Sequence, residues 1–127
     1  MIAMKQVYEP AAESDGYRVL AERLWPRGER KAKAKLDAWE KAIAPSADLR
    51  RWYGHDPKKW TEFQARYERE LAIPAAQAIL DDLAERARHG TVTLVYASHA
   101  GEISNTAVLL RLLQERIAHT HGKRASA

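Results

Sequence analysis

One seven-residue segment, TVTLVYA at residues 91–97, constrains the fold of this chain more than any other. Most of its side chains are β-branched or aromatic, and apolarity runs through it almost without a break. This pattern is typical of a strand that lies in the middle of a sheet and is buried on both faces. Strands of this kind occur in parallel sheets that helices cover on both sides, so the segment predicts an α/β domain.

Two further strands and five helices are predicted around this segment. Residues 3–8 and 17–25 have the composition of strands, and residues 17–25 carry apolar side chains on both faces. The helices follow from apolar residues at helical spacing and from capping residues. The first helix carries Leu36, Trp39 and Ile43, and the other four begin at Ser46, Asp56 with Pro57, Pro74, and Ser104 or Asn105.

The order of these elements predicts a single compact domain. Strand, strand, four helices, strand and helix form a small, mostly parallel sheet of about three strands covered by about five helices. A right-handed crossover between residues 17–25 and 91–97 makes these two strands parallel. We expect the domain to cover residues 1–118, because a chain of 127 residues suits one moderate core. Residues 119–127 are small, polar and basic, and we expect them to form a disordered tail.

Several classes of chemistry are excluded by residues and motifs that the chain lacks. It has no cysteine, which rules out disulfides, thiolate nucleophiles and cysteine-ligated zinc. No HExxH, GxSxG, GxGxxG or GxxxxGKS/T motif occurs, so we expect neither a metal nor a cofactor. No apolar run approaches the roughly 20 residues that span a bilayer, and the N-terminal residues lack the pattern of a secretory signal. We therefore expect a cytoplasmic protein that does not associate with membranes.

All four tryptophans lie between Trp25 and Trp60, interleaved with arginines and one histidine. The densest parts are RLWPRG at residues 23–28 and APSADLRRWYGHDP at residues 44–57. In parallel sheets, ligands bind beyond the carboxyl ends of the strands, where the loops after residues 17–25 and 91–97 would meet. Rigid rings beside guanidinium groups suit a ligand that bears a phosphate or a carboxylate. The sequence therefore predicts a pocket for a small anionic ligand at these strand ends.

For several residues of the predicted pocket, the sequence allows either a functional or a purely structural role. Arg23, at the exit of its strand, would bind the anion or form a salt bridge to an acidic neighbour. His55 would act as a general acid or base oriented by Asp56, or hydrogen-bond to the backbone while Asp56 caps a helix. Whether the protein is an enzyme stays open. The other predicted contacts are the anion ligands Arg27 and Arg50, the aromatic walls Trp25 and Trp52, and Asn105 at the start of the last helix.

A second hypothesis assigns a different partner to the basic face from Arg27 to Lys35. The formal net charge of +4 and the isoelectric point of about 9.5 favour anionic partners. A nucleic acid or another protein would bind there, although 17 acidic residues dispersed along the chain disfavour a dedicated nucleic-acid binder. In a third interpretation, the tryptophans and arginines are structural and clamp irregular connections onto the sheet.

Four segments of the chain carry unusual motifs: DG-R-L--RLWPRG at residues 15–28, W-K--APS--LR-W-GHD at 39–56, F---Y--EL at 63–71, and VTL-YA followed by N-A within 92–107. Together they resemble the YeaO-like family of small bacterial proteins. The resemblance covers nearly the whole chain and implies a cytoplasmic bacterial protein, but it carries no activity, ligand or cofactor over to this sequence. The chain departs from the family pattern at Ala21 and Glu22, where the usual pair is Val-Asp.

Overall fold

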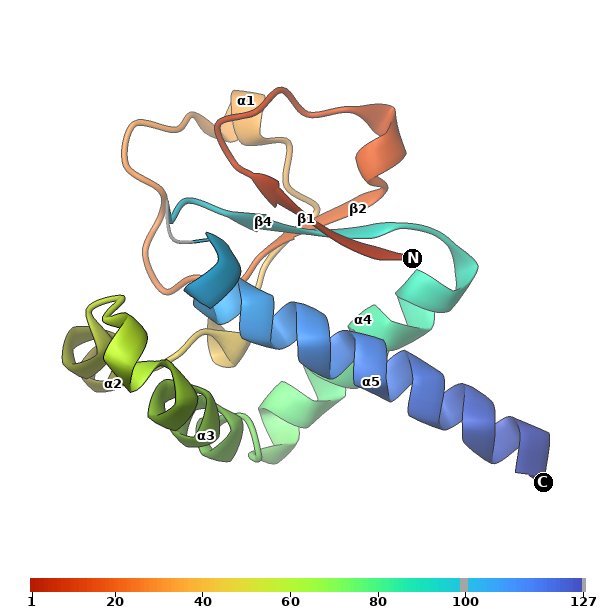
Figure 1. Cartoon of the computed structure of the whole chain (residues 1–127). Helices are drawn as coiled ribbons and strands as arrows, with labels where there is room; N and C mark the ends of the chain where they lie inside the picture. The colour runs from red at the N-terminus through yellow and green to blue at the C-terminus, as the bar shows by residue number, and fades with distance from the viewer. Residues whose placement is uncertain (99–100, 127) are drawn as a thin grey trace.

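The computed structural model describes residues 1–98 and 101–126, with the side chains of residues 119–126 outside this description. Its centre is a parallel four-stranded sheet in the order β1-β4-β2-β3 (Figure 1). This arrangement confirms the predicted α/β fold class and adds one strand to the expected three. The strands are β1 at Ile2–Gln6, β4 at Val92–Tyr96, β2 at Tyr17–Leu20 and β3 at Ala38–Trp39.

Strand β4 lies in the interior of the sheet, as its apolar sequence predicts. It pairs with β1 on one side and with β2 on the other. Val92 and Leu94 are buried in the main core, and Val95 is buried in a smaller cluster with Val7 and Ala34. Both faces of the strand are therefore covered, which explains why its sequence shows almost no polar alternation.

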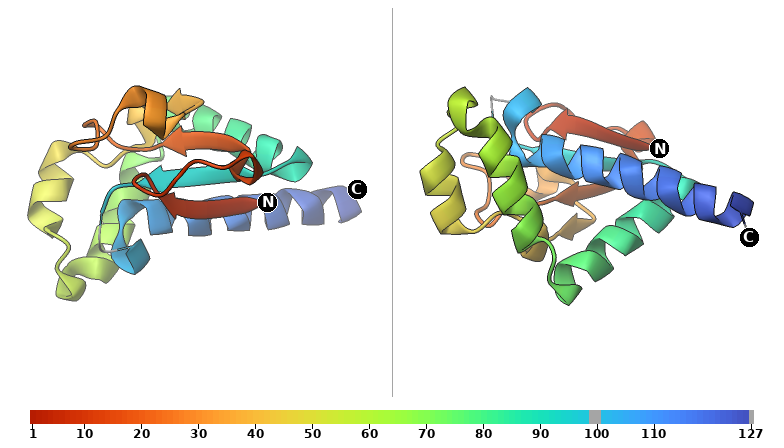
Figure 2. Two further views of the ribbon diagram at one scale, coloured as in Figure 1. Left: turned by 90° about the horizontal axis from the view of Figure 1, so that it is seen from above. Right: turned by 60° about the horizontal axis from the view of Figure 1, so that its bottom comes forward.

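Helices cover the two faces of the sheet unequally. The five α-helices are α1 at Lys31–Ala34, α2 at Ala47–Tyr53, α3 at Trp60–Glu70, α4 at Pro74–His89 and α5 at Asn105–Ser126. Figure 1 shows α4 and α5 below the sheet and the short α1 above it. Figure 2 shows α2 and α3 at the end of the sheet to which the strand arrows point. This end is the carboxyl edge, where parallel sheets bind their ligands.

Capping residues confirm the predicted helix starts on both sides of α2. The Ser46 side chain accepts a hydrogen bond from the Leu49 N–H at 3.1 Å, and Gly54 ends the helix in the left-handed conformation. Asp56 accepts from the Lys58 N–H at 3.0 Å, and thereby caps the short 3-10 helix Pro57–Lys59 that leads into α3. The local sequence therefore determines the path of the chain around the carboxyl edge.

The helix expected around Leu36, Trp39 and Ile43 was a wrong prediction. Ala38 and Trp39 form β3, the outer strand beside β2, and a 3-10 helix follows at Lys41–Ile43. Leu36 packs in the small cluster on one face of the sheet, whereas Ile43 is buried in the main core on the other. A helix presents residues at this spacing on one side only, so the chain must be extended to supply both clusters.

The strand predicted at residues 17–25 is also shorter than expected, because β2 ends at Leu20. The segment after it leaves the sheet, which takes Arg23 to an exposed position. At the other end of the chain, α5 is helical as far as Ser126. The separate tail that we expected for residues 119–127 remains a prediction, since the side chains of that part lie outside the description.

A buried polar cluster lies under α1, on the less covered face of the sheet. Arg18 is only 3% exposed and donates from Nη1 to Asp15 Oδ2 at 2.7 Å. Its Nε and Nη2 atoms donate to the Ala34 carbonyl oxygen at 3.0 and 2.7 Å. The Thr93 hydroxyl donates to the Asp15 carbonyl at 2.6 Å. One guanidinium group thus ties the end of α1 and the turn before β2 to the sheet.

The Asp15 carboxylate is held in its charged form by this cluster. Burial raises the pKa of Asp15, but hydrogen bonds from the Ala12 N–H, Lys5 and Arg18 outweigh that effect and lower the pKa below its ordinary value of 3.8. The stabilisation from Asp15 is present above this ordinary pKa and is lost as the pH falls through the lowered one.

The two arginines of this region should differ sharply in their effect on stability. We expect Arg18→Met to lower the free energy of unfolding by about 3 kcal/mol, because it leaves a buried carboxylate short of a partner. Arg23→Met removes one partly buried hydrogen bond to the Pro45 carbonyl, which costs about 1 kcal/mol. Urea unfolding at neutral pH measures both values. Equal losses in the two variants would contradict the assignment of Arg18 as the structural arginine.

Candidate functional site

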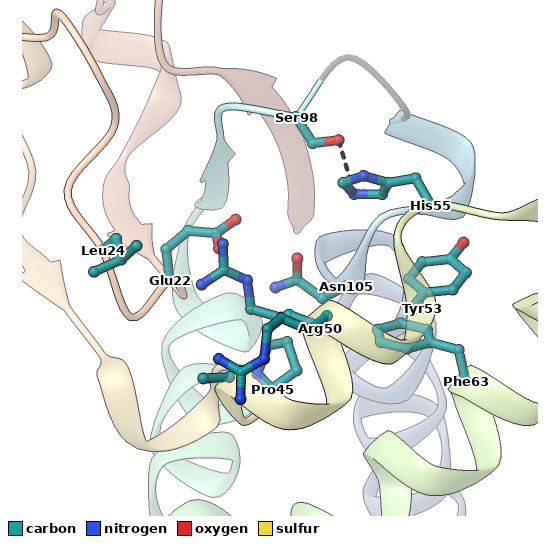
Figure 3. Close-up of a pocket in the computed structure, with 11 residues that line it drawn as sticks. Glu22, Leu24, Pro45, Arg50, Tyr53, His55, Phe63, Ser98 and Asn105 are labelled. Carbon is teal, nitrogen blue, oxygen red and sulfur yellow. Dashed lines mark hydrogen bonds between the residues drawn. The ribbon is translucent and has the colours of Figure 1, made fainter.

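A pocket of about 480 Å³ opens at the carboxyl edge of the sheet (Figure 3). Four parts of the chain form it: the segment after β2, the region of α2 and α3, the segment after β4, and the start of α5. Its polar lining consists of Glu22, Arg50, Arg51, His55, Ser98 and Asn105. Its apolar lining consists of Leu24, Pro45, Ala47, Tyr53 and Phe63.

The apolar wall of the pocket is rigid because its rings are stacked and anchored. Tyr53 and Phe63 stack with their centroids 4.1 Å apart. The Tyr53 hydroxyl donates to the Ile103 carbonyl at 2.7 Å, which joins the end of α2 to the turn before α5. Both rings are also part of the main core. A ligand would therefore meet a preformed surface on this side.

Glu22 and Arg50 carry the opposite charges of the pocket. Burial raises the pKa of the Glu22 carboxyl, and the nearby positive charge of Arg50 opposes this shift only in part. Within the described residues, neither side chain has a hydrogen-bond or ion-pair partner. The Glu22 backbone is nevertheless fixed, since its carbonyl accepts from Trp39 Nε1 at 2.6 Å. Perturbed titratable groups in a pocket are typical of functional sites.

His55 adopts an unusual backbone conformation at the pocket mouth. Its φ angle is 56°, in the left-handed region that costs a non-glycine residue about 1–2 kcal/mol. The ring lies edge-on to Tyr53 with a centroid distance of 5.6 Å, and Nε2 lies 3.3 Å from Ser98 Oγ. The carboxylate of Asp56 instead accepts from the Lys58 N–H, so the structure favours the capping alternative for this residue.

Asn105 joins the start of α5 to the segment after β2. It is 8% exposed, and its Nδ2 donates to the Ala21 carbonyl at 3.1 Å. It also lies close enough to interact with the Tyr67 hydroxyl, whose pKa burial raises well above its ordinary value. The Tyr67 hydroxyl donates in turn to the Ile43 carbonyl. The pocket floor is thus connected to α3 and to the main core.

The structure brings three of the predicted site residues together, namely Arg50, His55 and Asn105. Arg23 lies at the rim of this site, where its Nε donates to the Pro45 carbonyl at 2.8 Å. Trp52 does not line the pocket; its ring packs under Arg66, with 4.2 Å from the guanidinium carbon to the ring centroid. The reason is its place on α2, which turns the ring toward α3.

Trp25 and Arg27 lie away from this pocket because the chain turns after β2. Trp25 contacts Trp39 edge-on at 5.3 Å between centroids and donates from Nε1 to the Glu29 carbonyl at 2.8 Å. The two rings line a separate cleft of about 240 Å³. Arg27 is exposed, and its carbonyl accepts a hydrogen bond from the Tyr8 hydroxyl at 3.0 Å.

The sequence analysis did not include Glu22, Tyr53, Phe63 or Ser98 in the site. A signal existed for Glu22, because it replaces the aspartate usual in the family pattern. Phe63 belongs to the apolar stripe of α3, which is typical of core residues, and both Tyr53 and Phe63 are buried in the main core. Ser98 follows the clearest strand of the chain directly, which is the position where parallel sheets place ligand contacts.

Two further features bear on the class of site. Among the described residues, no group of three or more histidine or acidic side chains is arranged to hold a metal ion. None of the helices in the described part combines the length and apolarity that crossing a bilayer requires.

The fold and the site define a small α/β domain with a polar pocket at the carboxyl edge of a parallel sheet. All of the chain, residues 1–127, matches the family model described as "Inactive DUF488-N3 subclade". It is 42% identical over 115 residues to the uncharacterized protein Rv3073c of Mycobacterium tuberculosis, covering 91% of this chain and 95% of that protein. It is 40% identical over 97 residues to the uncharacterized protein YeaO of Escherichia coli, covering 76% and 83%.

The chain therefore belongs to the YeaO-like family, which confirms the resemblance seen in its motifs. No solved structure matches it. The description of the subclade as inactive is the one functional term in these comparisons.

The strained backbone of His55 yields a test of its role. Glycine at this position relieves the left-handed strain, and we expect His55→Gly to raise the free energy of unfolding by about 0.5 kcal/mol. As a control, Gly54→Ala imposes the same conformation on a side chain (φ 53°) and should cost about 1 kcal/mol. Urea unfolding compares the two. A loss above about 1 kcal/mol in His55→Gly would show that its ring stabilises the fold instead.

Proposed function

We propose that this protein binds a small molecule bearing a phosphate or carboxylate in the pocket at the carboxyl edge of the sheet. The observation that carries this proposal is the Arg50 guanidinium, which points into the pocket and has no hydrogen-bond or salt-bridge partner among the described residues (Figure 3). A guanidinium group matches the oxygens of carboxylates and phosphates in a bidentate geometry. Among the described residues, Arg51 is ion-paired with Asp48, and Arg23 donates from the rim to the Pro45 carbonyl.

The surroundings of Arg50 support the same ligand class. The helix α5 begins at Asn105, so the positive end of its dipole lies at the pocket. Ser98 and His55 add a hydroxyl group and an imidazole on the same side. Tyr53 and Phe63 supply an apolar wall for the rest of the ligand.

Binding without turnover accounts best for these features. The Asp56 carboxylate, which we expected to orient His55 as a general base, accepts a hydrogen bond from the Lys58 N–H instead. The inactive label of the subclade points in the same direction. We therefore assign His55 to ligand contact rather than to proton transfer.

Two arginines give a matched test of the pocket. Arg50 lines the pocket, whereas Arg86 lies outside it on α4 and is ion-paired with Asp82. We expect inorganic phosphate at low salt to raise the melting temperature of wild type and of Arg86→Ala. Arg50→Ala should weaken phosphate binding roughly fivefold, because one charged hydrogen-bonding group is lost. Isothermal titration calorimetry measures the affinities. Equal affinity in Arg50→Ala and wild type, or no binding to wild type, would refute the proposal.

A second candidate function is favoured by the cleft between Trp25 and Trp39. Lys31 lines this cleft, and Lys41 Nζ lies 4.2 Å from the centroid of the Trp39 ring. Aromatic rings beside lysines form the stacking and phosphate contacts by which proteins hold single-stranded nucleic acids. The basic face from Arg27 to Lys35 would extend the phosphate track.

Salt dependence tests this second candidate. If a single-stranded oligonucleotide binds at the Trp25–Trp39 cleft, its affinity should fall steeply between about 50 and 200 mM salt. Lys31→Glu should weaken binding, whereas Lys58→Glu, the same charge change in the 3-10 helix before α3 and outside the cleft, should not. Fluorescence anisotropy of a labelled oligonucleotide measures both. Salt-independent affinity, or equal losses in the two variants, would argue against a nucleic-acid site.

A further inference from the structure

Glu22 and Arg50 contribute opposite charges to the pocket, although the proposed ligand is anionic. Glu22 comes from the segment after β2 and Arg50 from α2, and Figure 3 shows both side chains directed into the same space. The two groups interact electrostatically, yet no direct ion pair joins them in the described part of the chain. A ligand that carried only negative charge would gain from Arg50 and be repelled by Glu22.

The Glu22 carboxylate lacks the donors that a partly buried carboxylate needs. No described group donates a hydrogen bond to it, and burial raises its pKa despite the nearby Arg50. A charged group that is removed from water is stabilised by a hydrogen-bonded partner of opposite charge. The Glu22 carboxylate would therefore be stabilised by a ligand group that is positively charged and donates hydrogen bonds. Such a group would lie beside Arg50, the residue proposed to bind the anion.

Asn105 adds a second acceptor to this side of the pocket. Its Nδ2 donates to the Ala21 carbonyl, and this contact fixes the orientation of the amide. The remaining polar atom of the side chain is the acceptor Oδ1. Within the described residues, Oδ1 accepts no hydrogen bond. A carboxylate and an amide oxygen together suit an ammonium group, which has three donors.

We propose that the ligand of this pocket is zwitterionic, with a primary ammonium group that Glu22 and Asn105 bind and a phosphate or carboxylate that Arg50 binds. This inference rests on the proposed anion-binding function and narrows its ligand class to amino-phosphates and amino-carboxylates. It also explains how a carboxylate is tolerated in an anion-binding pocket, since ligand binding pairs both fixed charges at once.

A matched pair of probes tests this inference. O-phosphoethanolamine and propyl phosphate share the phosphate and have chains of similar length, but only the first carries an ammonium group. We expect wild type to bind O-phosphoethanolamine roughly fivefold more tightly than propyl phosphate at neutral pH and low salt, as measured by calorimetry. In Glu22→Gln, which keeps the shape and removes the charge, the two affinities should agree within about twofold.

The variant should fold, because the sign of the pKa shift favours a neutral side chain at this position. A raised pKa means that the native state is less stable with Glu22 ionised, so Glu22→Gln should unfold at the same or a higher urea concentration than wild type at neutral pH. The glutamine amide can also still accept from an ammonium group, so any remaining preference measures the contribution of charge.

The possible outcomes distinguish failure of the zwitterionic ligand from failure of the proposed anion-binding function. Equal binding of both probes to wild type would overturn the zwitterionic ligand and leave the anion pocket intact. A preference for O-phosphoethanolamine that persists unchanged in Glu22→Gln would show that Glu22 is not its partner. Failure of wild type to bind either probe, or inorganic phosphate, would refute the anion pocket and this inference together.

Discussion

The candidate site depends on the parallel pairing of β2 with β4. Leu20 lies beside Val95 in this register, so both strands end at the same edge of the sheet. The segment that carries Glu22 and the residue that follows β4 by two positions, Ser98, therefore leave the sheet side by side. An antiparallel arrangement would place them at opposite ends of the domain. The placement of Glu22 and Ser98 at one pocket therefore depends on this alignment.

Gly16 and Arg18 stabilise this pairing at the start of β2. A β-carbon on Gly16, where φ is 63°, would overlap the Thr91 carbonyl, so only glycine allows the chain to enter β2 beside β4. Arg18 then binds α1 and the preceding turn to the sheet. These contacts of Arg18 lie away from the pocket. The side chains of Arg50 and Glu22 take no part in them. The division between the two faces explains why one arginine is fully partnered and another is not.

The sequence allowed the α/β class, the interior strand and four of the helix starts to be predicted. Those features follow from local signals such as the cap at Ser46 and the apolarity of residues 91–97. The end of β2 was missed because the alternation of Val19, Ala21 and Arg23 continues past Leu20. The two-residue strand β3 is too short to show a period. Its pairing depends on contacts with residues almost twenty positions earlier.

The location of the candidate site was predicted better than the residues that line it. Topology alone brought the loops after β2 and β4 together, and Arg50, His55 and Asn105 follow from it. Trp25 was wrongly predicted to line the pocket. The sequence shows that aromatic residues cluster along the chain, but it does not show on which side of the turn after β2 each ring lies. Glu22 was left out because spacing in the sequence does not show which acidic residues lie together in space. The structure gives it a reason through its position opposite Arg50.

The most direct test of the account is a map of ligand-induced shifts in backbone amide NMR signals. On titration with O-phosphoethanolamine, the account predicts that the largest shifts occur near Glu22, across residues 50–55 and at the start of α5 around Asn105. These three segments are remote in sequence and meet only in the pocket. Shifts confined to α1 and the neighbourhood of Trp39, or scattered over exposed charged residues, would contradict a ligand site at the carboxyl edge of the sheet.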